Sequence, residues 1–379
     1  MAGRRRYIRP MKNKDVMDEA RFVRDLCDWF DVHGRDLPWR HGYDPYQVWI
    51  SEIMAQQTQM GRVVEYFKRW LDRFPDPESL AAAHEEEVLK LWEGLGYYNR
   101  ARNLHKASRV VASLGGFPRT YEDILALPGI GPYTAGAILS VAFNESCPAV
   151  DANVERVFAR LYNLDKPVRN AANQAFIEDR ARALIPEGRA RMFNQALMEL
   201  GALVCTPKKP ACGGCPVAAC CRSRALGVEH ERPVLGKKQE VVRVTVATGA
   251  LIYDGQVYIQ KRRSDDVWPG LWEFPGGGIE EGETPEQAVV REYLEETGVQ
   301  AEPVIKSGVV KYAYTKFRVT LHCFYMRYRN GYTRPACHEA VEGRFVNLEQ
   351  LDQFAFPAGH RRFIENLRAD PKFIALLAS

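Results

Sequence analysis

The chain has no apolar run long enough to cross a membrane, which excludes proteins anchored by helical spans. It also has no internal repeat and no low-complexity segment, which excludes repeat arrays. Of its 379 residues, 46% are hydrophobic and 26% are charged, which is the composition of an ordinary soluble protein. This length allows two or three domains, each with its own core.

The chain also has little excess of either charge sign. Its formal net charge is +4, so a DNA-binding surface has to come from local patches. One such patch is the amino terminus, where six basic residues precede the first acid, Asp15. No apolar segment follows that could form a secretory signal, and we interpret this patch as a tail weakly attracted to DNA.

Disulfide bonds are not expected, although the chain contains nine cysteines. Four of them, with six, two and five residues between them, have the spacing of a metal site: Cys205, Cys212, Cys215 and Cys221. Four thiolates bind either zinc or an iron–sulfur cluster, and the spacing alone does not choose between the two. Since nothing indicates export, we expect a reducing, cytoplasmic setting.

Two textures divide the chain. Residues 15–225 show the apolar spacing of helices, as in Phe22-Val23-Leu26-Trp29-Phe30, and few strand signals. Residues 226–243 lack periodicity and are interpreted as a linker. Residues 244–370 contain alternating, β-branched runs around one helical pattern, which predicts an α+β domain.

A glycine-rich turn stands out in the helical part, in Leu127-Pro-Gly-Ile-Gly-Pro-Tyr-Thr-Ala-Gly136. Gly129 and Gly131 allow backbone conformations closed to other residues and leave amide groups bare, and a helix starting near Tyr133 would aim its positive amino terminus at a phosphate. Such a hairpin can hold a DNA backbone without reading its sequence. The alternative for an isolated Pro-Gly-x-Gly is an ordinary joint between helices.

Two carboxylates accompany this turn. Glu52 lies in Ser51-Glu-Ile-Met-Ala-Gln-Gln-Thr-Gln59, at the start of a helical pattern that continues to Trp70, and could face a pocket. Asp151 lies in Val150-Asp-Ala-Asn153, downstream of the turn. The structural alternatives are a carboxylate at a helix start for Glu52 and an N-cap for Asp151.

These features, with Leu37-Pro-Trp-Arg40, Gly94-Leu-Gly-Tyr-Tyr-Asn-Arg-Ala-Arg-Asn103 and Phe193-Asn-Gln-Ala-Leu-Met-Glu-Leu-Gly201, resemble the helix-hairpin-helix DNA glycosylases that carry an iron–sulfur cluster. Within them, the likeness is to the MutY-type adenine glycosylases, from about Leu37 to Cys221. The resemblance implies an all-α domain of two helical modules with the active cleft between them. It also implies a [4Fe-4S] cluster on the four cysteines, with its loop at residues 205–221.

The activity that the resemblance implies is base-excision repair by a monomer. Its substrate would be double-stranded DNA in which adenine is mispaired with 8-oxoguanine or guanine. Expelling adenine from the sugar requires a proton donor and a negative partner for the cationic sugar. Glu52 matches the family acid, and Asp151 matches the carboxylate that stabilises or transiently bonds the sugar carbon. Asn153 would orient Asp151. Relatives that also cut the strand carry a lysine where Tyr133 stands, so a monofunctional enzyme is implied.

The resemblance also assigns DNA contacts. Gln57 resembles a residue that wedges into the base stack, with a solvated helix face as the alternative. Gln195 resembles one that hydrogen-bonds the extruded adenine. Trp39 and Arg40 would line the base pocket, although Trp39 could equally be core. The other predicted DNA-binding residues are Gly129, Gly131, Lys208 and Lys209. Cys220 is interpreted as a bystander beside the cluster.

The second domain contains Gly277-x5-Glu283-x7-Arg291-Glu292-Tyr293-Leu294-Glu295-Glu296-Thr297-Gly298-Val299, which resembles the Nudix box except that Tyr293 replaces an aliphatic residue. In a helix Glu292, Glu295 and Glu296 share one face. Such crowding favours a cation, and Mg²⁺ with the carbonyl of Gly277 as a further ligand is the natural candidate.

Adenine glycosylases of the resembling family carry a Nudix-like tail that recognises 8-oxoguanine opposite adenine, usually with an eroded box. Here the box is intact. Tyr314, Thr315 and Lys316 stand where the family commonly has Phe-Ser-His, which implies a lesion-recognition loop that keeps an aromatic and a hydroxyl. His360 stands where nucleotide-cleansing relatives place an asparagine that reads 8-oxoguanine, which argues against that nucleotide as a substrate.

Three alternatives accompany this interpretation. One is a bifunctional chain whose Nudix domain also hydrolyses nucleoside diphosphate derivatives. Another is a DNA-binding redox or lesion-sensing protein, which the retention of both Glu52 and Asp151 disfavours. The third is an endonuclease III-like bifunctional glycosylase, which Tyr133 disfavours.

Overall fold

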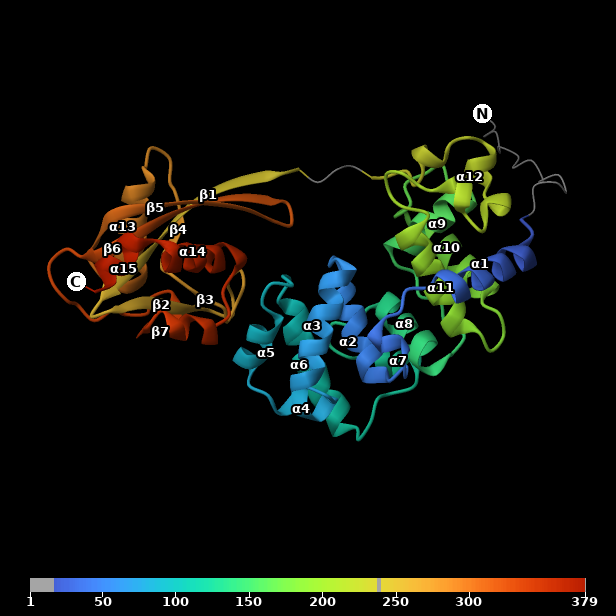
Figure 1. Cartoon of the computed structure of the whole chain (residues 1–379), viewed down its shortest axis with the longest axis horizontal. Helices are drawn as coiled ribbons and strands as arrows, with labels where there is room; N and C mark the ends of the chain where they lie inside the picture. The colour runs from blue at the N-terminus through green and yellow to red at the C-terminus, as the bar shows by residue number, and fades with distance from the viewer. Residues whose placement is uncertain (1–16, 237–239, 379) are drawn as a thin grey trace, which may run out of the picture. The chain divides into compact units, whose positions relative to one another are not determined.

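The computed structural model describes residues 17–236 and 240–378 of the chain (Figure 1). The basic amino-terminal patch and residues 237–239 of the predicted linker lie outside these ranges. Among the described residues, no helix combines the length and the apolarity that a membrane span needs. All nine cysteines are described, and none is in a disulfide bond.

Helices make up the described chain before residue 237, and strands follow after residue 240, as the two sequence textures predict. The α-helices of the first part are α1 (Glu19–His33), α2 (Pro45–Ala55), α3 (Met60–Arg73), α4 (Pro77–Ala82), α5 (Glu85–Trp92), α6 (Asn99–Ser113), α7 (Tyr121–Leu125), α8 (Pro132–Phe143), α9 (Ala152–Leu161), α10 (Ala171–Leu184), α11 (Ala190–Leu203) and α12 (Arg222–Ala225). The 3-10 helices are η1 (Pro38–Arg40), η2 (Cys212–Gly214), η3 (Ala218–Cys220), η4 (Glu229–Glu231) and, in the second part, η5 (Glu349–Gln353).

The second part contains a mixed sheet and three α-helices. The strands are β1 (Val242–Tyr253), β2 (Gln256–Arg262), β3 (Trp272–Glu273), β4 (Gly276–Gly278), β5 (Ala301–Tyr314), β6 (Phe317–Tyr328) and β7 (Ala340–Val346). The helices are α13 (Pro285–Thr297), α14 (Ala358–Ala369) and α15 (Pro371–Leu377). The predicted order of an all-α part followed by an α+β part is therefore confirmed.

The chain divides into two compact units that do not follow the order of the sequence. One unit contains residues 1–67 and 110–238, and the other contains residues 68–109 and 239–379. Helices α4, α5 and most of α6 thus belong to the unit that holds the sheet. The domain limits predicted from the sequence, 15–225, 226–243 and 244–370, stay a prediction.

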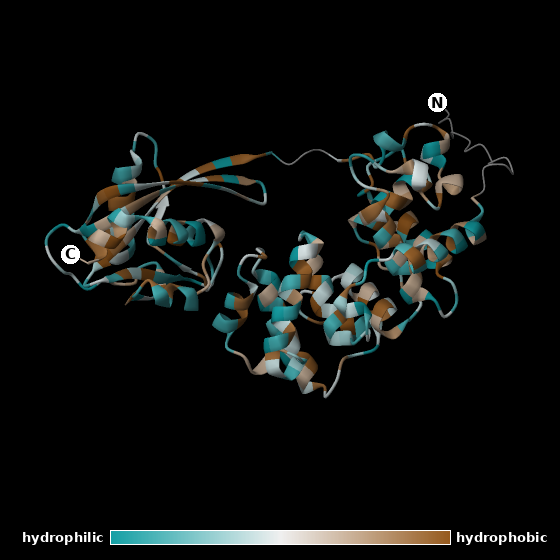
Figure 2. Cartoon of the chain, in the orientation of Figure 1, coloured by the Kyte–Doolittle hydropathy of each residue, from teal (hydrophilic) through white to brown (hydrophobic). Residues whose placement is uncertain are grey.

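The first unit is built around α1, α9, α10 and α11, whose apolar faces meet in one core. Most of the helices contain both hydrophobic and hydrophilic residues, as expected of helices with one buried face (Figure 2). Capping side chains fix where the helices begin: Asp18 accepts from the backbone of Arg21 in α1, and Asp44 from that of Gln47 in α2. A short hairpin joins α7 to α8, and Pro132 occupies the first turn of α8.

The sheet of the second unit has the order β3-β2-β1-β6-β5, with β4 paired to β1 and β7 paired to β2. β1 and β6 are parallel, whereas the other recorded pairs are antiparallel. Ala250 and Ile252 belong to the core cluster that contains residues of α14, and Leu251 belongs to the cluster with residues of α13. Because alternate residues of a strand face opposite sides, α13 and α14 cover opposite faces of the sheet.

The unusual tyrosine of the Nudix-like segment has a structural explanation. Tyr293 is fully buried in the cluster under α13, and its hydroxyl donates to the backbone oxygen of Gly249 at 2.6 Å. A side chain at Gly249 would meet Met326 and Tyr293 at close range. The large ring therefore fills space that an aliphatic residue at 293 would leave beside this glycine.

Candidate active site and associated centres

A cavity of about 740 Å³ lies within the first unit, between η1, the end of α2, the starts of α8 and α9, and α11. Side chains that are far apart in the sequence meet at its wall. Eight of the residues predicted for catalysis or for the base pocket line it: Trp39, Arg40, Glu52, Gln57, Tyr133, Asp151, Asn153 and Gln195.

Glu52 and Tyr133 form the direct contact at the wall of this cavity. The phenol of Tyr133 donates a short hydrogen bond to Glu52 Oε2 and lies 3.5 Å from Met198 Sδ. Burial raises the pKa of Glu52 to about 7, and the negative charge of Asp151 adds to the rise, while the Tyr133 hydrogen bond and Arg40 oppose it. Burial also raises the pKa of Tyr133 well above its ordinary value. The pair can therefore hold protons near neutral pH.

Asp151 combines a structural role with a place in the cavity. It is the N-cap of α9, and its Oδ1 accepts from the backbone N–H of Val154 at 2.7 Å. Its Oδ2 accepts from Asn153 Nδ2 at 2.6 Å. Burial raises the pKa of Asp151, and these hydrogen bonds oppose the rise. The N-cap alternative is therefore correct and does not remove Asp151 from the cavity wall.

Arg156 connects Asn153 to the cysteine-containing loop, and the sequence interpretation did not single it out. Its Nη2 donates to Asn153 Oδ1 at 2.7 Å and to the Gly201 backbone oxygen at 2.8 Å, and its Nε donates to the Cys205 oxygen at 2.7 Å. A Cβ at Gly201 would lie 2.6 Å from Asn153 Cβ, so this close approach needs glycine. The i+3 spacing from Asn153 to Arg156 on one helix was the available signal.

Glu199 is a second buried acid that the sequence interpretation missed. It is 2% exposed, and its carboxylate accepts from Arg35 Nε at 2.7 Å, from Arg35 Nη2 at 2.9 Å and from Arg40 Nη2 at 3.1 Å. Burial acts to raise the pKa of Glu199, but the two guanidinium groups outweigh it and leave the pKa lowered. Arg40 is thus held at the cavity wall by an ionised partner. A lone acid in the apolar pattern of α11 was the available signal.

Gln57 is not on a helix, so the solvated-helix alternative is wrong for this residue. The helical pattern predicted from Glu52 to Trp70 is interrupted after Ala55, and Gln57 lies exposed in the turn before α3 with φ +57. Left-handed backbone is strained for residues other than glycine, and this exposed residue is one of those that line the cavity.

Gln195 and Trp39 are buried residues of the cavity wall. Gln195 is 3% exposed, and its side-chain amide donates to the Arg191 backbone oxygen at 3.2 Å. Trp39 is 6% exposed and packs edge-on against Phe67 at 5.1 Å between ring centroids. Trp39 thus belongs to the core and also lines the cavity, while its place in a base pocket stays a prediction.

The hairpin predicted to grip phosphate has the expected left-handed backbone at Gly129, but the prediction is wrong for Gly131, whose φ of −101 and ψ of 175 other residues also adopt. Gly129 adopts φ +78 and is exposed, and Gly131 is the N-cap of α8 without a side-chain cap. The amides of the first turn of α8 are consequently left without a capping side chain. Lys208 and Lys209 are also exposed, on a loop closed by the Thr206 hydroxyl, which donates to the Lys209 oxygen at 2.6 Å.

The four predicted ligand cysteines meet around one cavity of about 30 Å³. Arg160, 2% exposed, organises the loop: it donates to the Cys205 backbone oxygen and sulfur, both at 3.2 Å, and to the Thr206 oxygen at 2.8 Å. Cys220 does not line the cavity and lies 3.9 Å from the Asp18 oxygen. Among the described residues, no three His, Cys, Asp or Glu side chains are grouped to hold a single metal ion.

A second pocket, of about 240 Å³, lies within the sheet-containing unit. Residues 94–98 form one wall, and Trp268, residues 312–315 and residues 357–358 form the rest. The Tyr314 ring lies 5.8 Å from that of Tyr97 and 5.0 Å from that of Trp268. Of the predicted lesion-recognition residues, Tyr314 and Thr315 line the pocket, and Lys316 is exposed next to it.

In the Nudix-like segment, Arg291 is the partner of most acids. It donates to Glu283 Oε1 at 2.9 Å, to Glu292 Oε1 at 2.9 Å and to Glu295 Oε2 at 3.0 Å. Glu296 is buried and accepts from Gln260 and from the backbone of Gly276, each at 3.0 Å. A Cβ at Gly277 would meet the Glu292 carboxylate at 2.4 Å. Gly277 and Glu292 are therefore adjacent, Glu292 and Glu295 share Arg291, and Glu296 faces Gln260 and Gly276 instead.

His360 faces the core. Burial lowers its pKa to about 3, and its Nδ1 accepts from the Phe274 backbone N–H at 3.3 Å.

Comparison with known proteins identifies both parts. Residues 50–178 match the HhH-GPD superfamily of base excision DNA repair proteins, and residues 247–366 match the NUDIX domain. A solved structure of a thermostable thymine-DNA glycosylase is similar with a TM-score of 0.50 and 32% identity, over 55% of this chain and 97% of that one. The class defined by the fold and the cavity is thus a helix-hairpin-helix repair protein with an appended NUDIX domain.

Two curated relatives specify the family. The adenine DNA glycosylase of Rattus norvegicus is 44% identical over 220 residues, which cover 55% of this chain and 43% of the rat protein. That of Mycolicibacterium smegmatis is 42% identical over 262 residues, 64% of this chain and 84% of the relative. The chain belongs to the adenine DNA glycosylase family, as predicted. It spans less than half the length of the mammalian relatives that it matches.

The raised pKa of Glu52 predicts a pH-dependent stability. An acid whose folded-state pKa lies near 7, above the usual 4.5, stabilises the fold below about pH 4.5, and this contribution is lost as pH rises through about 7. Glu52→Gln cannot ionise and should remove the loss, which we expect to be about 3 kcal/mol. Urea unfolding of both proteins at several pH values measures it. Equal pH dependence in the two proteins would contradict the buried, protonated state of Glu52.

Proposed function

We propose that this protein hydrolyses the N-glycosidic bond of adenine mispaired with 8-oxoguanine or guanine in double-stranded DNA. The observation that carries the proposal is the meeting of Glu52, Tyr133 and Asp151 at the wall of one cavity. Breaking this bond requires a proton for the leaving base and a negative charge for the cationic sugar. Two carboxylates with different surroundings can divide these tasks.

Glu52 is the proton donor in this mechanism. Its pKa of about 7 keeps a proton available at neutral pH, and the phenol of Tyr133 holds the carboxyl in place. Asp151 faces the sugar and stabilises its positive charge. Asn153 and the backbone of Val154 hold the orientation of Asp151 through both carboxylate oxygens. Tyr133 has no amine for a Schiff base with the sugar, which supports a monofunctional enzyme.

Adenine reaches the cavity by leaving the base stack. Extrusion costs a few kcal/mol, which contacts in the pocket have to offset. Gln57, in its strained turn at the cavity wall, is suited to fill the vacated space, while Gln195, Trp39 and Arg40 line the base pocket. The hairpin at Gly129 and Gly131 holds the phosphate backbone with the amino terminus of α8. Lys208 and Lys209 add positive charge on an exposed loop.

We propose further that Cys205, Cys212, Cys215 and Cys221 hold a [4Fe-4S] cluster. The support is a shared cavity lined by these four thiols and by apolar residues, with Arg160 fixing the loop around it. Such a cluster would rigidify the loop that presents Lys208 and Lys209.

Adenine excision is the first test. The purified protein should release free adenine from a duplex with adenine opposite 8-oxoguanine and leave an abasic strand that breaks only after base or heat. Glu52→Gln and Asp151→Asn should each lower the single-turnover rate by about 10²–10⁴-fold, because each removes one of the two groups that the transition state needs. Binding to the duplex should persist in both variants. A wild-type rate in Glu52→Gln would overturn the assignment of the acid.

The cluster is tested by composition. The protein purified without oxygen should be brown and should contain about four irons per chain. Replacing any of the four ligand cysteines by serine should impair cluster retention, whereas Cys220→Ser is the matched control and should retain it. A colourless protein with stoichiometric zinc would contradict the proposal.

Lesion recognition is proposed for the pocket that contains Tyr314 and Thr315, with Lys316 beside it. The aromatic rings of Tyr97, Tyr314 and Trp268 around one pocket are suited to hold a flat base. Tyr314→Ala should reduce the preference for 8-oxoguanine over guanine opposite adenine by about tenfold or more, and the rate opposite guanine should change little. Single-turnover rates on the two duplexes measure the preference. An unchanged preference would remove this role.

A second candidate activity is hydrolysis of a nucleoside diphosphate derivative with Mg²⁺. The observation that favours it is the position of Glu292 beside Gly277, with Glu295 held by the same arginine as Glu292 and Glu296 bonded to the backbone of Gly276. Glu295→Gln serves as the test because this side chain is half exposed. If it abolishes a Mg²⁺-dependent release of phosphate or pyrophosphate from a nucleotide panel, the second activity is real. It should leave adenine excision unchanged.

A further inference from the structure

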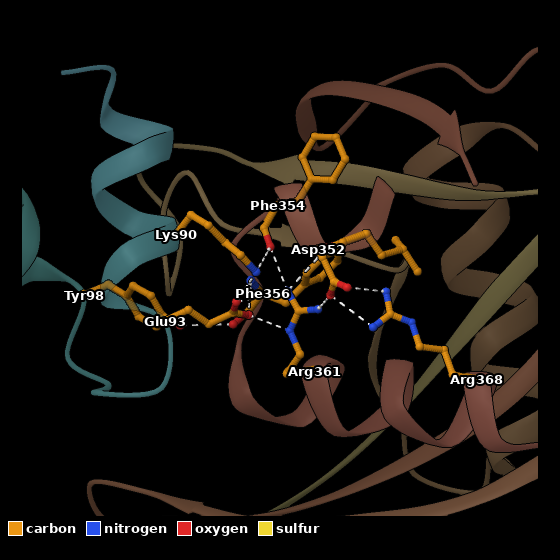
Figure 3. Close-up of polar contacts among 9 residues, drawn as sticks. Lys90, Glu93, Tyr98, Asp352, Phe354, Phe356, Arg361 and Arg368 are labelled. Atoms are coloured by element: carbon orange, nitrogen blue, oxygen red, sulfur yellow. Dashed lines mark hydrogen bonds and ion pairs between the residues drawn. The ribbon is translucent and has the colours of Figure 1, made fainter. Parts of the chain in front are cut away.

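A dense polar cluster joins the helical segment 68–109 to the carboxy-terminal part of the same compact unit (Figure 3). Glu93 follows α5, and Arg361 lies in α14. The guanidinium of Arg361 donates to Glu93 through Nε at 2.8 Å and through Nη2 at 3.0 Å. The two side chains are 13% and 18% exposed, so this bidentate pair is largely withdrawn from water.

The carboxylate of Glu93 has further donors. Lys90 Nζ donates to it at 2.6 Å, and the backbone N–H of Phe356 donates to it at 3.0 Å. Lys90 also donates to the Phe354 oxygen at 3.1 Å, and the hydroxyl of Tyr98 donates to the Phe356 oxygen at 3.1 Å. Because a buried acid is costly unless it is fully bonded, these contacts specify one arrangement of the two segments.

The cluster lies where both walls of the aromatic pocket begin. Glu93 directly precedes residues 94–98, which form one wall, and Phe356 directly precedes residues 357–358, which form part of the other. Tyr97 adopts the left-handed φ of +49, which is strained for a tyrosine. Contacts on either side of residues 94–98 must therefore hold this loop in its conformation. Trp92 Nε1 holds the same loop by donating to the Gly96 oxygen at 3.0 Å.

Helix α14, which contains Arg361, also contacts the end of β5, where Tyr314 lies. At Gly359 an added Cβ would lie 2.5 Å from the ring of Tyr312, so the helix and the end of β5 are in close contact. One residue beyond Arg361, Arg362 Nη1 donates to the Lys311 oxygen at 3.0 Å. The ring of Tyr314 therefore stands at a distance from Tyr97 that the Glu93–Arg361 pair helps to set.

We propose that Glu93 and Arg361 are positioning residues for lesion discrimination. They hold the loop of Tyr97 and the loop of Tyr314 at the separation that a flat oxidised base requires. This inference rests on the lesion-recognition role proposed above for Tyr314. Neither residue lines the cavity of Glu52 and Asp151, so the pair governs the choice of opposite base rather than the chemistry.

The test compares Arg361→Ala with Arg368→Ala in the full-length chain. Both arginines lie in α14 and donate to Asp352 Oδ1 at 3.1 Å, but the described contacts of Arg368 stay within η5 and its flank. Arg361→Ala should lower the preference for 8-oxoguanine over guanine by about tenfold, equal to about 1.4 kcal/mol, and Arg368→Ala should preserve it. Glu93→Gln, which keeps the shape of the side chain, should act like Arg361→Ala. The rate opposite guanine should stay within about twofold in all three.

Coupling separates positioning from general loss of structure. If Arg361 acts through the aromatic pocket, adding Arg361→Ala to Tyr314→Ala should reduce the preference no further. Additive losses, or equal falls in both rates, would overturn the inference, as would an unchanged preference in Arg361→Ala and Glu93→Gln while Tyr314→Ala lowers it. An unchanged preference in Tyr314→Ala would instead remove the lesion role on which the inference rests.

Discussion

The carboxylate of Asp151 has a position fixed by the fold, because the same group caps α9 and lines the cavity wall. A cap fixes the carboxylate more firmly than a side chain on a helix surface could be fixed, since both oxygens accept hydrogen bonds from α9 itself. Arg156 extends this fixation to the cysteine loop through Asn153. The position of the carboxylate therefore depends on the packing of α9 against α11.

The two carboxylates of the cavity have different electrostatic surroundings. Glu52 has a protonated phenol as its direct partner, and burial leaves its pKa at about 7. Burial also raises the pKa of Asp151, but the hydrogen bonds from Val154 and Asn153 oppose this rise. A third acid, Glu199, has a lowered pKa because Arg35 and Arg40 favour its ionised form, and it supports the cavity wall by holding Arg40. Three acids that line the cavity thus have three environments, which is the condition for different chemical roles.

In the sheet-containing unit, hydrogen bonds within the protein accommodate the acids of the Nudix-like segment. Arg291 satisfies Glu283, Glu292 and Glu295, while Glu296 turns to the buried amide of Gln260. The aromatic pocket of the same unit is assembled from a loop of the helical segment and the tip of β5. The aromatic pocket and the acids of α13 therefore occupy different parts of this unit.

Local sequence patterns determined much of this protein. Spacing and turn residues predicted the glycine hairpin, the four-cysteine loop, the acidic helix and the order of an all-α part before an α+β part, because each of these reflects backbone conformation over a few residues. Tertiary structure alone decided which distant groups meet. Arg35 and Glu199 are 164 residues apart, and Arg361 and Glu93 are 268 residues apart. Ion pairs of this kind leave no periodic trace, since their geometry depends on the packing of whole helices rather than on neighbouring residues. The apolar pattern of the sequence likewise did not predict the break between α2 and α3 at Gln57, because the same spacing continues across the turn into α3.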